Sequence, residues 1–232
     1  MSTSYTRGFA TTLIAIAASA CATAPRPTSA STAAVIPTAV INPQSEAAAI
    51  EQARADSVRH PYTEADIRFM SGMIHHHSQA IVMARWAQSH GASPAVQRLA
   101  DRIINAQQDE ILTMQNWLRD RQQPVPDATP TGMTMSMGGM QHEMLMPGML
   151  TEAQMKQLDA ARGPEFDRLF LTYMIQHHKG AVSMVKDLFG SYGAGQDEIV
   201  FKFASDVNVD QTTEIARMEK MLISVTLGID TQ

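Results

Sequence analysis

Two copies of a short His/Met pattern hold the side chains of this sequence best suited to binding a metal ion. The first copy, MIHHHSQAIVM, covers residues 73–83, and the second, MIQHHKGAVSM, covers residues 174–184. In a helix, successive residues turn by about 100°, so each copy aligns two methionines and one histidine in a stripe, with a second histidine on its flank. The stripes are formed by Met73, His76 and Met83 with His77 on the flank, and by Met174, His177 and Met184 with His178 on the flank.

The histidines of these stripes need an explanation that the methionines do not. Methionines at helical spacing usually fill a core. A buried imidazole, in contrast, needs a partner at both ring nitrogens and is costly as filler. Imidazole and thioether together favour a soft monovalent ion, Cu(I) or Ag(I), over hard ions such as Mg²⁺. Thiolates would bind such ions more tightly, but they form disulfides in an oxidising compartment.

A methionine-rich segment, GMTMSMGGMQHEMLMPGM, lies between the two copies over residues 132–149. It holds seven of the 17 methionines of the chain, and no helical period predicts a core to bury them. Met-x-Met and Met-x-x-Met spacings in a flexible segment allow two or three sulfurs to reach one ion. We predict that this loop captures the ion and that the helical histidines form a more ordered site. The candidate ligands of the loop are Met133, Met135, Met137, Met140, His142, Met144, Met146 and Met149.

Two glutamates, Glu110 and Glu214, occupy equivalent places in the two halves, each four residues before a methionine, Met114 or Met218. Inward glutamates are typical of di-iron bundles, but those also need a Glu-x-x-His pair on each of the other two helices. A methionine stands at that place in both copies. We therefore predict that these two glutamates, with the two methionines, surround the metal ligands and orient the histidines. The alternatives are a ferritin-like di-metal oxidoreductase that uses iron, and a metal-free envelope interaction protein.

Cap signals and helical spacing predict the elements that position these groups. The expected helices cover residues 46–59, 63–89, 93–123, 151–162, 165–189 and 197–226. The halves over residues 60–123 and 151–228 match each other, and two similar helix hairpins can cover each other's apolar faces. The sequence thus predicts an all-α four-helix bundle, a single domain over residues 46–232 with the methionine-rich linker at 124–150.

The N-terminal residues indicate export. Residues 1–20 carry one charged side chain, Arg7, followed by an apolar run and small residues, which is typical of a signal peptide. Cys21, the only cysteine, follows Ala-Ser-Ala and resembles the acylated cysteine of a bacterial lipoprotein, although Ala18 stands where leucine is usual. Residues 21–45 are rich in Ala, Thr, Ser and Pro and predict a disordered tether. We expect a periplasmic protein held at the membrane by a lipid anchor, with plain secretion as the alternative.

Charge and hydropathy exclude other classes of partner. The formal net charge is −5, and phosphate binding needs a basic face, so we expect no nucleic-acid partner. Beyond the N-terminus no apolar run reaches the roughly 18 residues of a membrane span. No nucleophile–base arrangement is visible, so we do not predict an enzyme. The expected partners are the metal ion and a copper-efflux or delivery protein.

Four segments of the sequence resemble motifs of a known protein family. MIHHHSQAIVMA, MIQHHKGAVSMV, AQQDEILTMQNWL and GPEFDRLFLTYMIQHH are similar to motifs of the exported proteins grouped as domain of unknown function 305, over about residues 60–225. The resemblance implies a ferritin-like helical bundle and, as in some periplasmic members, copper or silver binding. It implies as ligands Met73, His76, His77 and Met83, with Met174, His177, His178 and Met184. The second copy departs from the first at Gln176 and at Lys179, whose added charge beside His178 predicts unequal affinity of the two sites.

Overall fold

The computed structural model describes residues 43–59, 61–137 and 140–228, and within these ranges the side chains of residues 56–57 and 133–143 are not described. The expected signal peptide and Cys21 lie outside the described residues, as does the expected tether except for its last three residues. Those three residues are helical, because the first helix begins at Pro43 and not at residue 46. None of the described helices combines the length and apolar character needed to cross a membrane.

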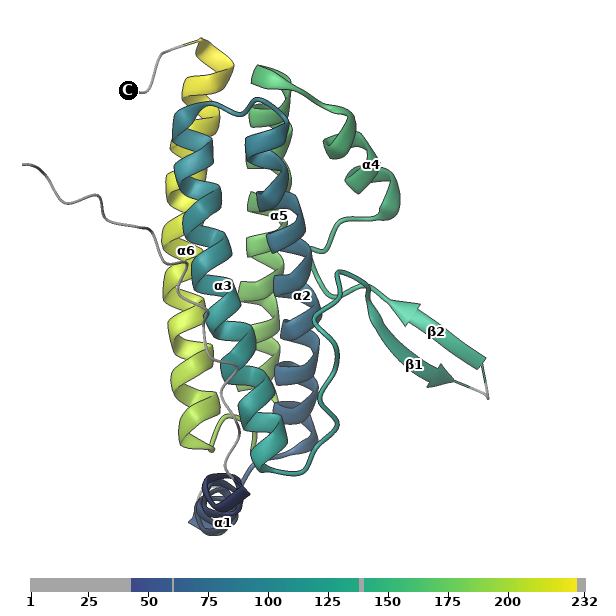
Figure 1. Ribbon diagram of the computed structural model, residues 1–232, viewed down its shortest axis with the longest axis vertical. Helices are drawn as coiled ribbons and strands as arrows, with labels where there is room; N and C mark the ends of the chain where they lie inside the picture. The colour runs from purple at the N-terminus through teal and green to yellow at the C-terminus, as the bar shows by residue number, and fades with distance from the viewer. Residues whose placement is uncertain (1–42, 60, 138–139, 229–232) are drawn as a thin grey trace, which may run out of the picture. The chain divides into compact units, whose positions relative to one another are not determined.

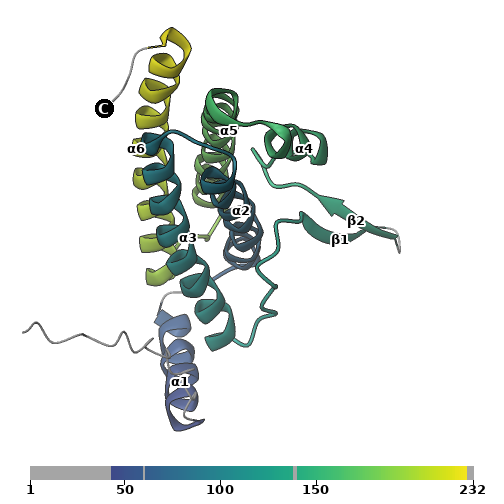
Figure 2. The same cartoon turned by 45° about the horizontal axis from the view of Figure 1, so that its top comes forward.

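Six helices account for most of the described residues. They are α1 (Pro43–Arg59), α2 (Glu64–Ser89), α3 (Pro94–Asp120), α4 (Glu152–Ala160), α5 (Gly163–Gly190) and α6 (Glu198–Leu227). The four long helices α2, α3, α5 and α6 lie side by side, whereas α1 and α4 lie outside this group (Figures 1 and 2). The all-α class predicted from the sequence is confirmed, and each helix end lies within a few residues of its expected place.

Capping side chains explain where the long helices begin. The Thr63 side chain accepts hydrogen bonds from backbone N–H groups in the first turn of α2. The Asp66 side chain in turn accepts a hydrogen bond from the Thr63 backbone N–H at 2.7 Å. Ser93 caps α3 ahead of Pro94, whose fixed φ suits the first helical position. Asp197 caps α6 through the backbone N–H groups of its first turn. The cap signals of the sequence therefore act where they were predicted.

Two buried aspartates at equivalent positions join the halves of the molecule. Asp66, in the first turn of α2, accepts a hydrogen bond from the backbone of Gly195 at 2.7 Å, in the connection between α5 and α6. Asp167, near the start of α5, accepts from the backbone of Ser93 at 3.1 Å, in the connection between α2 and α3. Each half thus holds, by a hydrogen bond, the connection between the two long helices of the other half. The two contacts fix α2 and α5 beside each other in opposite directions.

The apolar core consists of two clusters that lie on either side of the histidine pairs. One cluster contains Ala80 and Met83 of α2, and it also contains Met174 of α5 and Met218 of α6. The other contains Met73 of α2, and with it Met114, Ala181 and Met184. Because α2 and α5 run in opposite directions, the histidines of both helices fall at the level where the two clusters meet. A polar layer therefore divides the core.

The methionine-rich segment contains a β-hairpin, so the expectation of an irregular loop was wrong there. Strand β1 (Met133–Met137) pairs antiparallel with β2 (Met140–Met144), with Met133 opposite Met144 and Met135 opposite His142. The physical reason can be found in the sequence, where Met133, Met135 and Met137 alternate with Thr and Ser, Met140, His142 and Met144 alternate with Gln and Glu, and a Gly-Gly pair separates the two runs. Period-two alternation around a glycine pair is a hairpin signal.

Candidate metal centre

The centre of the site is a contact between two histidine rings from the two halves. The rings of His76 on α2 and His177 on α5 lie with their centroids 3.8 Å apart and their planes at 40°. His77 and His178 flank this pair, with ring centroids 6.3 and 6.4 Å from their neighbours His76 and His177. All four side chains are fully buried. The structure therefore brings the four predicted histidines together, and the flanking pair is buried as deeply as the central pair.

A glutamate from each outer helix reaches a flanking histidine. Nε2 of His178 donates to Oε2 of Glu214 on α6 at 2.8 Å. Nε2 of His77 lies 2.7 Å from Oε2 of Glu110 on α3, but the oxygen is off the N–H direction, so this is a close polar contact only. Burial alone would raise the pKa of Glu214, but the bond from His178 and the nearby Arg102 guanidinium hold it below its usual value.

Hydrogen bonds to two of the histidines fix which nitrogen keeps its lone pair. Nε2 of His76 lies 3.0 Å from the carbonyl oxygen of Pro147, which can only accept, so Nε2 carries the hydrogen. The carboxylate of Glu214 fixes His178 in the same way. In each neutral ring the lone pair is then on Nδ1. This is the arrangement by which proteins orient imidazoles toward a metal ion.

Among the described residues, six nitrogens of the four rings have no hydrogen-bond partner. They are Nδ1 of His76 and His178 and both nitrogens of His77 and His177. A buried polar atom without a partner costs about 1–3 kcal/mol, so such atoms call for an explanation. In the described residues no three His, Cys, Asp or Glu side chains surround one point as a metal site would. Imidazole nitrogens completed by thioethers fit a soft ion, which needs few ligands.

Buried methionines lie on both sides of the histidine layer, three on one side and, with Met70, four on the other. Met83, Met174 and Met218 belong to one apolar cluster, and Met73, Met114 and Met184 belong to the other. Five of these last six side chains are fully buried, and Met184 is 9% exposed. The sequence placed the same six residues at the site, and the structure groups them symmetrically about the rings.

Burial keeps the central histidines uncharged. Desolvation, with a contribution from His77, lowers the pKa of His76 from its ordinary value of 6.5 to about 3. The pKa of His177 is lowered as well, by burial first and then by His76. A histidine must be deprotonated to bind a metal ion. These two rings are already neutral near pH 7, so no proton has to leave them before the ion binds.

We predict that the metal-free protein loses stability as the pH falls below 6.5. The unfolded chain then binds a proton at His76 that the folded chain does not bind until about pH 3, so acid favours unfolding throughout this window. The expected loss is about 2 kcal/mol for His76 between about pH 7 and pH 5, and His177 adds to it in the same direction. Urea unfolding at several pH values measures the slope. A free energy of unfolding that is constant over this range would contradict neutral burial of these rings.

A short segment, residues 146–150, covers the histidines from the side of α2 and α5, and we call it the strap. Besides the His76 bond, the side chain of Gln79 donates to the carbonyl of Leu150 at 3.0 Å and accepts from its N–H at 2.6 Å. Gln176 donates to the carbonyl of Gly148 at 3.2 Å. Met149 and Leu150, the last two residues of the strap, are buried. Met149 is therefore part of the core, although the sequence placed it in an open loop.

Backbone packing holds the strap against α5. Gly148 has φ of +79°, and any Cβ there would come within 2.7 Å of the Gln176 carbonyl oxygen. A Cβ on Gly180 would overlap the carbonyl group of Pro147. The sequence analysis missed the strap. The signals that could have indicated it are the Pro147-Gly148 pair at the end of the methionine-rich run and Gly180 on the facing turn of α5.

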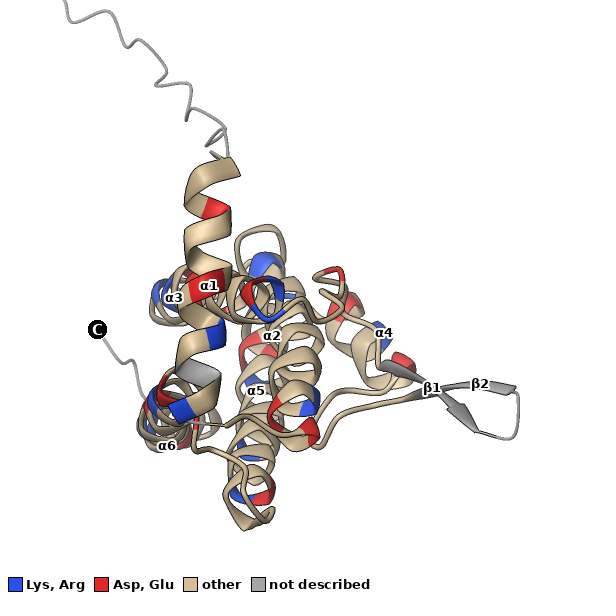
Figure 3. Cartoon of the chain, turned by 90° about the horizontal axis from the view of Figure 1, so that it is seen from below, with Lys and Arg blue, Asp and Glu red and all other residues tan. Residues whose placement is uncertain are grey.

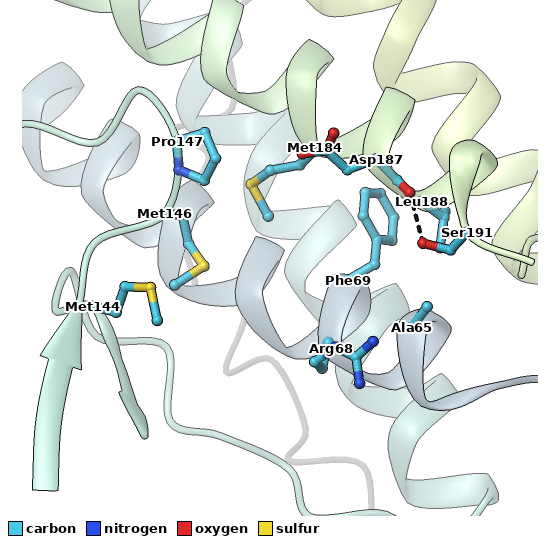
Figure 4. Close-up of a pocket in the computed structure, with 10 residues that line it drawn as sticks. All are labelled: Ala65, Arg68, Phe69, Met144, Met146, Pro147, Met184, Asp187, Leu188 and Ser191. Carbon is cyan, nitrogen blue, oxygen red and sulfur yellow. Dashed lines mark hydrogen bonds between the residues drawn. The ribbon is translucent and has the colours of Figure 1, made fainter. Parts of the chain in front are cut away.

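Beside the strap, a groove of about 350 Å³ lies between α2, α5 and the end of the hairpin. Met144, Met146 and Met184 line it, and their thioethers face the open space (Figure 4). Met144 is 46% exposed and Met184 is almost buried, so the methionines of the groove lie at different depths between the surface and the interior. The structure thus brings two ligands predicted in the loop next to one predicted in the second copy.

The side chains of the other predicted loop ligands are not described, although their backbone forms the hairpin. The side chains of Met133, Met135, Met137, Met140 and His142 are among those not described, and their role as ligands stays a prediction. His90, which the sequence analysis did not single out, is buried and bonds the backbone carbonyl of Asp159 at 2.9 Å. Its ring nitrogens have partners, in contrast to those of the central histidines.

The geometry can now be compared with known proteins. The family model described as "Domain of unknown function (DUF305)" matches residues 66–222. The chain belongs to the DUF305 family. A 56-residue stretch, 24% of the chain, is 41% identical to an uncharacterized protein of Acanthamoeba polyphaga mimivirus, and the match spans 37% of that protein.

Solved structures of DUF305 proteins have a similar fold. The crystal structure of a DUF305 protein from Streptomyces coelicolor is 29% identical, with a TM-score of 0.58 over 70% of this chain and 94% of that chain. A DUF305 fragment from Deinococcus radiodurans is 27% identical, with a TM-score of 0.57 over 70% and 97%. CopM in its Cu(II)-bound form is 28% identical, with a TM-score of 0.53 over 68% and 96%. CopM has also been solved in a Cu(I)-bound form.

Proposed function

We propose that this DUF305 protein binds and buffers Cu(I) or Ag(I) through the histidine layer and the methionines around it. The observation that carries the proposal is the set of six buried imidazole nitrogens without a hydrogen-bond partner, between two groups of buried methionines. A soft ion bound to Nδ1 nitrogens and thioethers would offset their desolvation, and the donor set favours Cu(I) and Ag(I). The similarity to CopM, which was solved with copper bound, supports this assignment.

The ion would enter through the groove. Met144, Met146 and Met184 offer thioethers from the surface inward, and the strap that carries Met146 also bonds His76 through Pro147. The hairpin methionines would capture the ion, and the histidine layer would hold it in a more ordered site. The ion is cargo in this scheme. The residues of the chain bind it, orient the rings and exclude water, and no catalytic step is assigned.

We further propose that the protein acts outside the cytoplasm. The pattern of residues 1–20 and the position of Cys21 support export and attachment by a lipid anchor. A family member from Streptomyces coelicolor is also designated a secreted protein. A copper-efflux or delivery protein would then receive the ion, and the acidic net charge gives no support to a nucleic-acid partner.

An anaerobic Cu(I) competition titration with metal counting tests the proposal. We expect the His76→Ala/His177→Ala variant to weaken the tightest site by about tenfold or more while the loop still binds. Replacement of Met133, Met135, Met137 and Met140 by leucine should lower the number of ions bound and leave the tightest site intact.

The matched control for the histidine variant is His75→Gln, which copies the second half of the chain at an equivalent place. His75 is only partly buried and contacts the Thr129 carbonyl at 3.2 Å, so its loss should not change the titration. Superimposable curves for the parent, the histidine variant and the methionine variant would refute the two-part mechanism.

A further inference from the structure

Helices α3 and α6 lie on the side of the bundle away from the hairpin (Figures 1 and 2). The residues of these two helices line a second cavity. Its volume is about 430 Å³. The backbones of α3 and α6 stay farther apart than those of α2 and α3 or of α5 and α6, which leaves the space open. Its walls carry matched residues of the two halves, Gln107 with Gln211 and Glu110 with Glu214.

Two amide oxygens at this cavity have no partner. The side chains of Gln107 and Gln211 are 3% and 4% exposed, and Oε1 of each lacks a hydrogen bond. A buried carbonyl-type oxygen left in this state costs about 1–3 kcal/mol. The two residues come from different helices and line the same space, so one ligand between them would satisfy both oxygens.

The cavity also holds more negative than positive charge. Glu110, Asp210 and Glu214 line it, and the one basic side chain there, Arg102, pairs with Glu214 at 3.3 Å. Burial raises the pKa of Asp210, and so do Glu110, Asp206 and Glu214. Acidic and basic side chains are mixed over the helices as a whole (Figure 3), so this concentration of carboxylates is local.

We propose that the cavity between α3 and α6 binds a hydrated hard divalent cation through the amide oxygens of Gln107 and Gln211, while the carboxylates of Glu110, Asp210 and Glu214 supply negative charge around the waters of the ion. Amide and carboxylate oxygens are the donors that Mg²⁺, Ca²⁺ and Mn²⁺ prefer. The described residues that line the cavity include neither methionine nor histidine, so a soft ion has no preferred donor there. A water molecule occupies about 30 Å³ of liquid, so the cavity admits a cation that keeps several waters.

This site differs in chemistry and place from the histidine layer. Glu110 and Glu214 stand between the two, with the cavity on one side and His77 or His178 on the other. The soft-ion site uses nitrogen and sulfur inside the bundle, whereas the second site uses oxygen at its α3–α6 side. The protein would therefore bind two classes of cation at once.

The test is a titration with Mn(II), counted by the electron paramagnetic resonance signal of the free ion. We expect the full-length protein to bind Mn(II), and saturation with Ag(I) beforehand to leave this binding unchanged. The Gln107→Leu/Gln211→Leu variant should bind Mn(II) more weakly by about tenfold or more. Its Ag(I) titration should match that of the parent, which shows that the variant is folded.

Charge-matched variants separate a bound cation from general attraction. Asp210→Asn should weaken Mn(II) binding, whereas Asp109→Asn removes the same charge from an exposed site on α3 outside the cavity and should not. Equal Mn(II) affinity in the parent and the glutamine double variant would overturn the proposal. Displacement of Mn(II) by Ag(I), ion for ion, would also overturn it, since one site would then serve both. Ag(I) binding without any Mn(II) binding would overturn this inference and leave the proposed function standing.

Discussion

Replacing Gly180 by alanine is expected to detach the strap from α5 and to lower the free energy of unfolding by about 3 kcal/mol. The new Cβ would occupy the place of the Pro147 carbonyl, and backbone on both sides leaves no flexible side chain to move. Once the strap moves, the hydrogen bond from His76 to Pro147 and the two Gln79 bonds to Leu150 break. The higher helix propensity of alanine offsets about 1 kcal/mol of the loss.

Hydrogen exchange provides the direct measurement. The Leu150 amide, bonded to Gln79, should lose its protection in the Gly180→Ala variant, and Ag(I) should bind faster because the histidines are uncovered. The matched control is Gly190→Ala at the end of the same helix, where a Cβ meets nothing within 4 Å. Full protection of Leu150 in the Gly180 variant would show that the strap tolerates the methyl group and does not cover the site as described.

Replacing His177 by leucine is expected to leave the metal-free protein at least as stable as the parent and to abolish most of its stabilisation by Ag(I). Both nitrogens of this buried ring lack partners, so an apolar side chain of similar size removes a cost and breaks no hydrogen bond. A ligand that binds only the folded state at about 100 times its Kd adds about 3 kcal/mol of stability, and this gain should disappear.

A second buried histidine supplies the control. His90 is bonded through both ring nitrogens, to Ser89 and to Asp159, so His90→Leu should destabilise the metal-free protein by about 1–3 kcal/mol and keep the Ag(I) effect. Thermal unfolding of both variants, with and without Ag(I), gives the comparison. If His177→Leu behaved as His90→Leu does, the central histidines would be structural and the metal proposal would fail.

The helices and the pairing of the two His/Met copies could be predicted because their signals are local or repeated. Thr63 with Asp66, and Ser93 with Pro94, mark helix starts within four residues of sequence. The equivalent positions of Glu110 and Glu214 then placed both carboxylates beside flanking histidines, as the structure shows. The periodicity of apolar residues predicts which face of a helix is buried, and the duplication predicts which helix packs against that face.

The strap and the α3–α6 cavity could not be predicted, because each depends on contacts that no local pattern records. Pro147 lies 71 residues from His76, and Gln79 lies as far from Leu150. The unpartnered oxygens of Gln107 and Gln211 depend on the distance between two helices, and a glutamine in a sequence carries no sign of its neighbours. The hairpin is different, since its period-two signal is present in the sequence and was missed.

The reciprocal fastening of the two halves has an evolutionary consequence. Asp66 holds the loop of the second half and Asp167 holds the loop of the first, so a lone helical hairpin pairing with an identical hairpin about a twofold axis would reproduce both bonds and all four rings. Fusion of two such genes would preserve that ancestral symmetric dimer inside one polypeptide. After such a fusion the two halves could diverge in sequence. The strap crosses only one side of the molecule, so a symmetric dimer would have had either two straps or none.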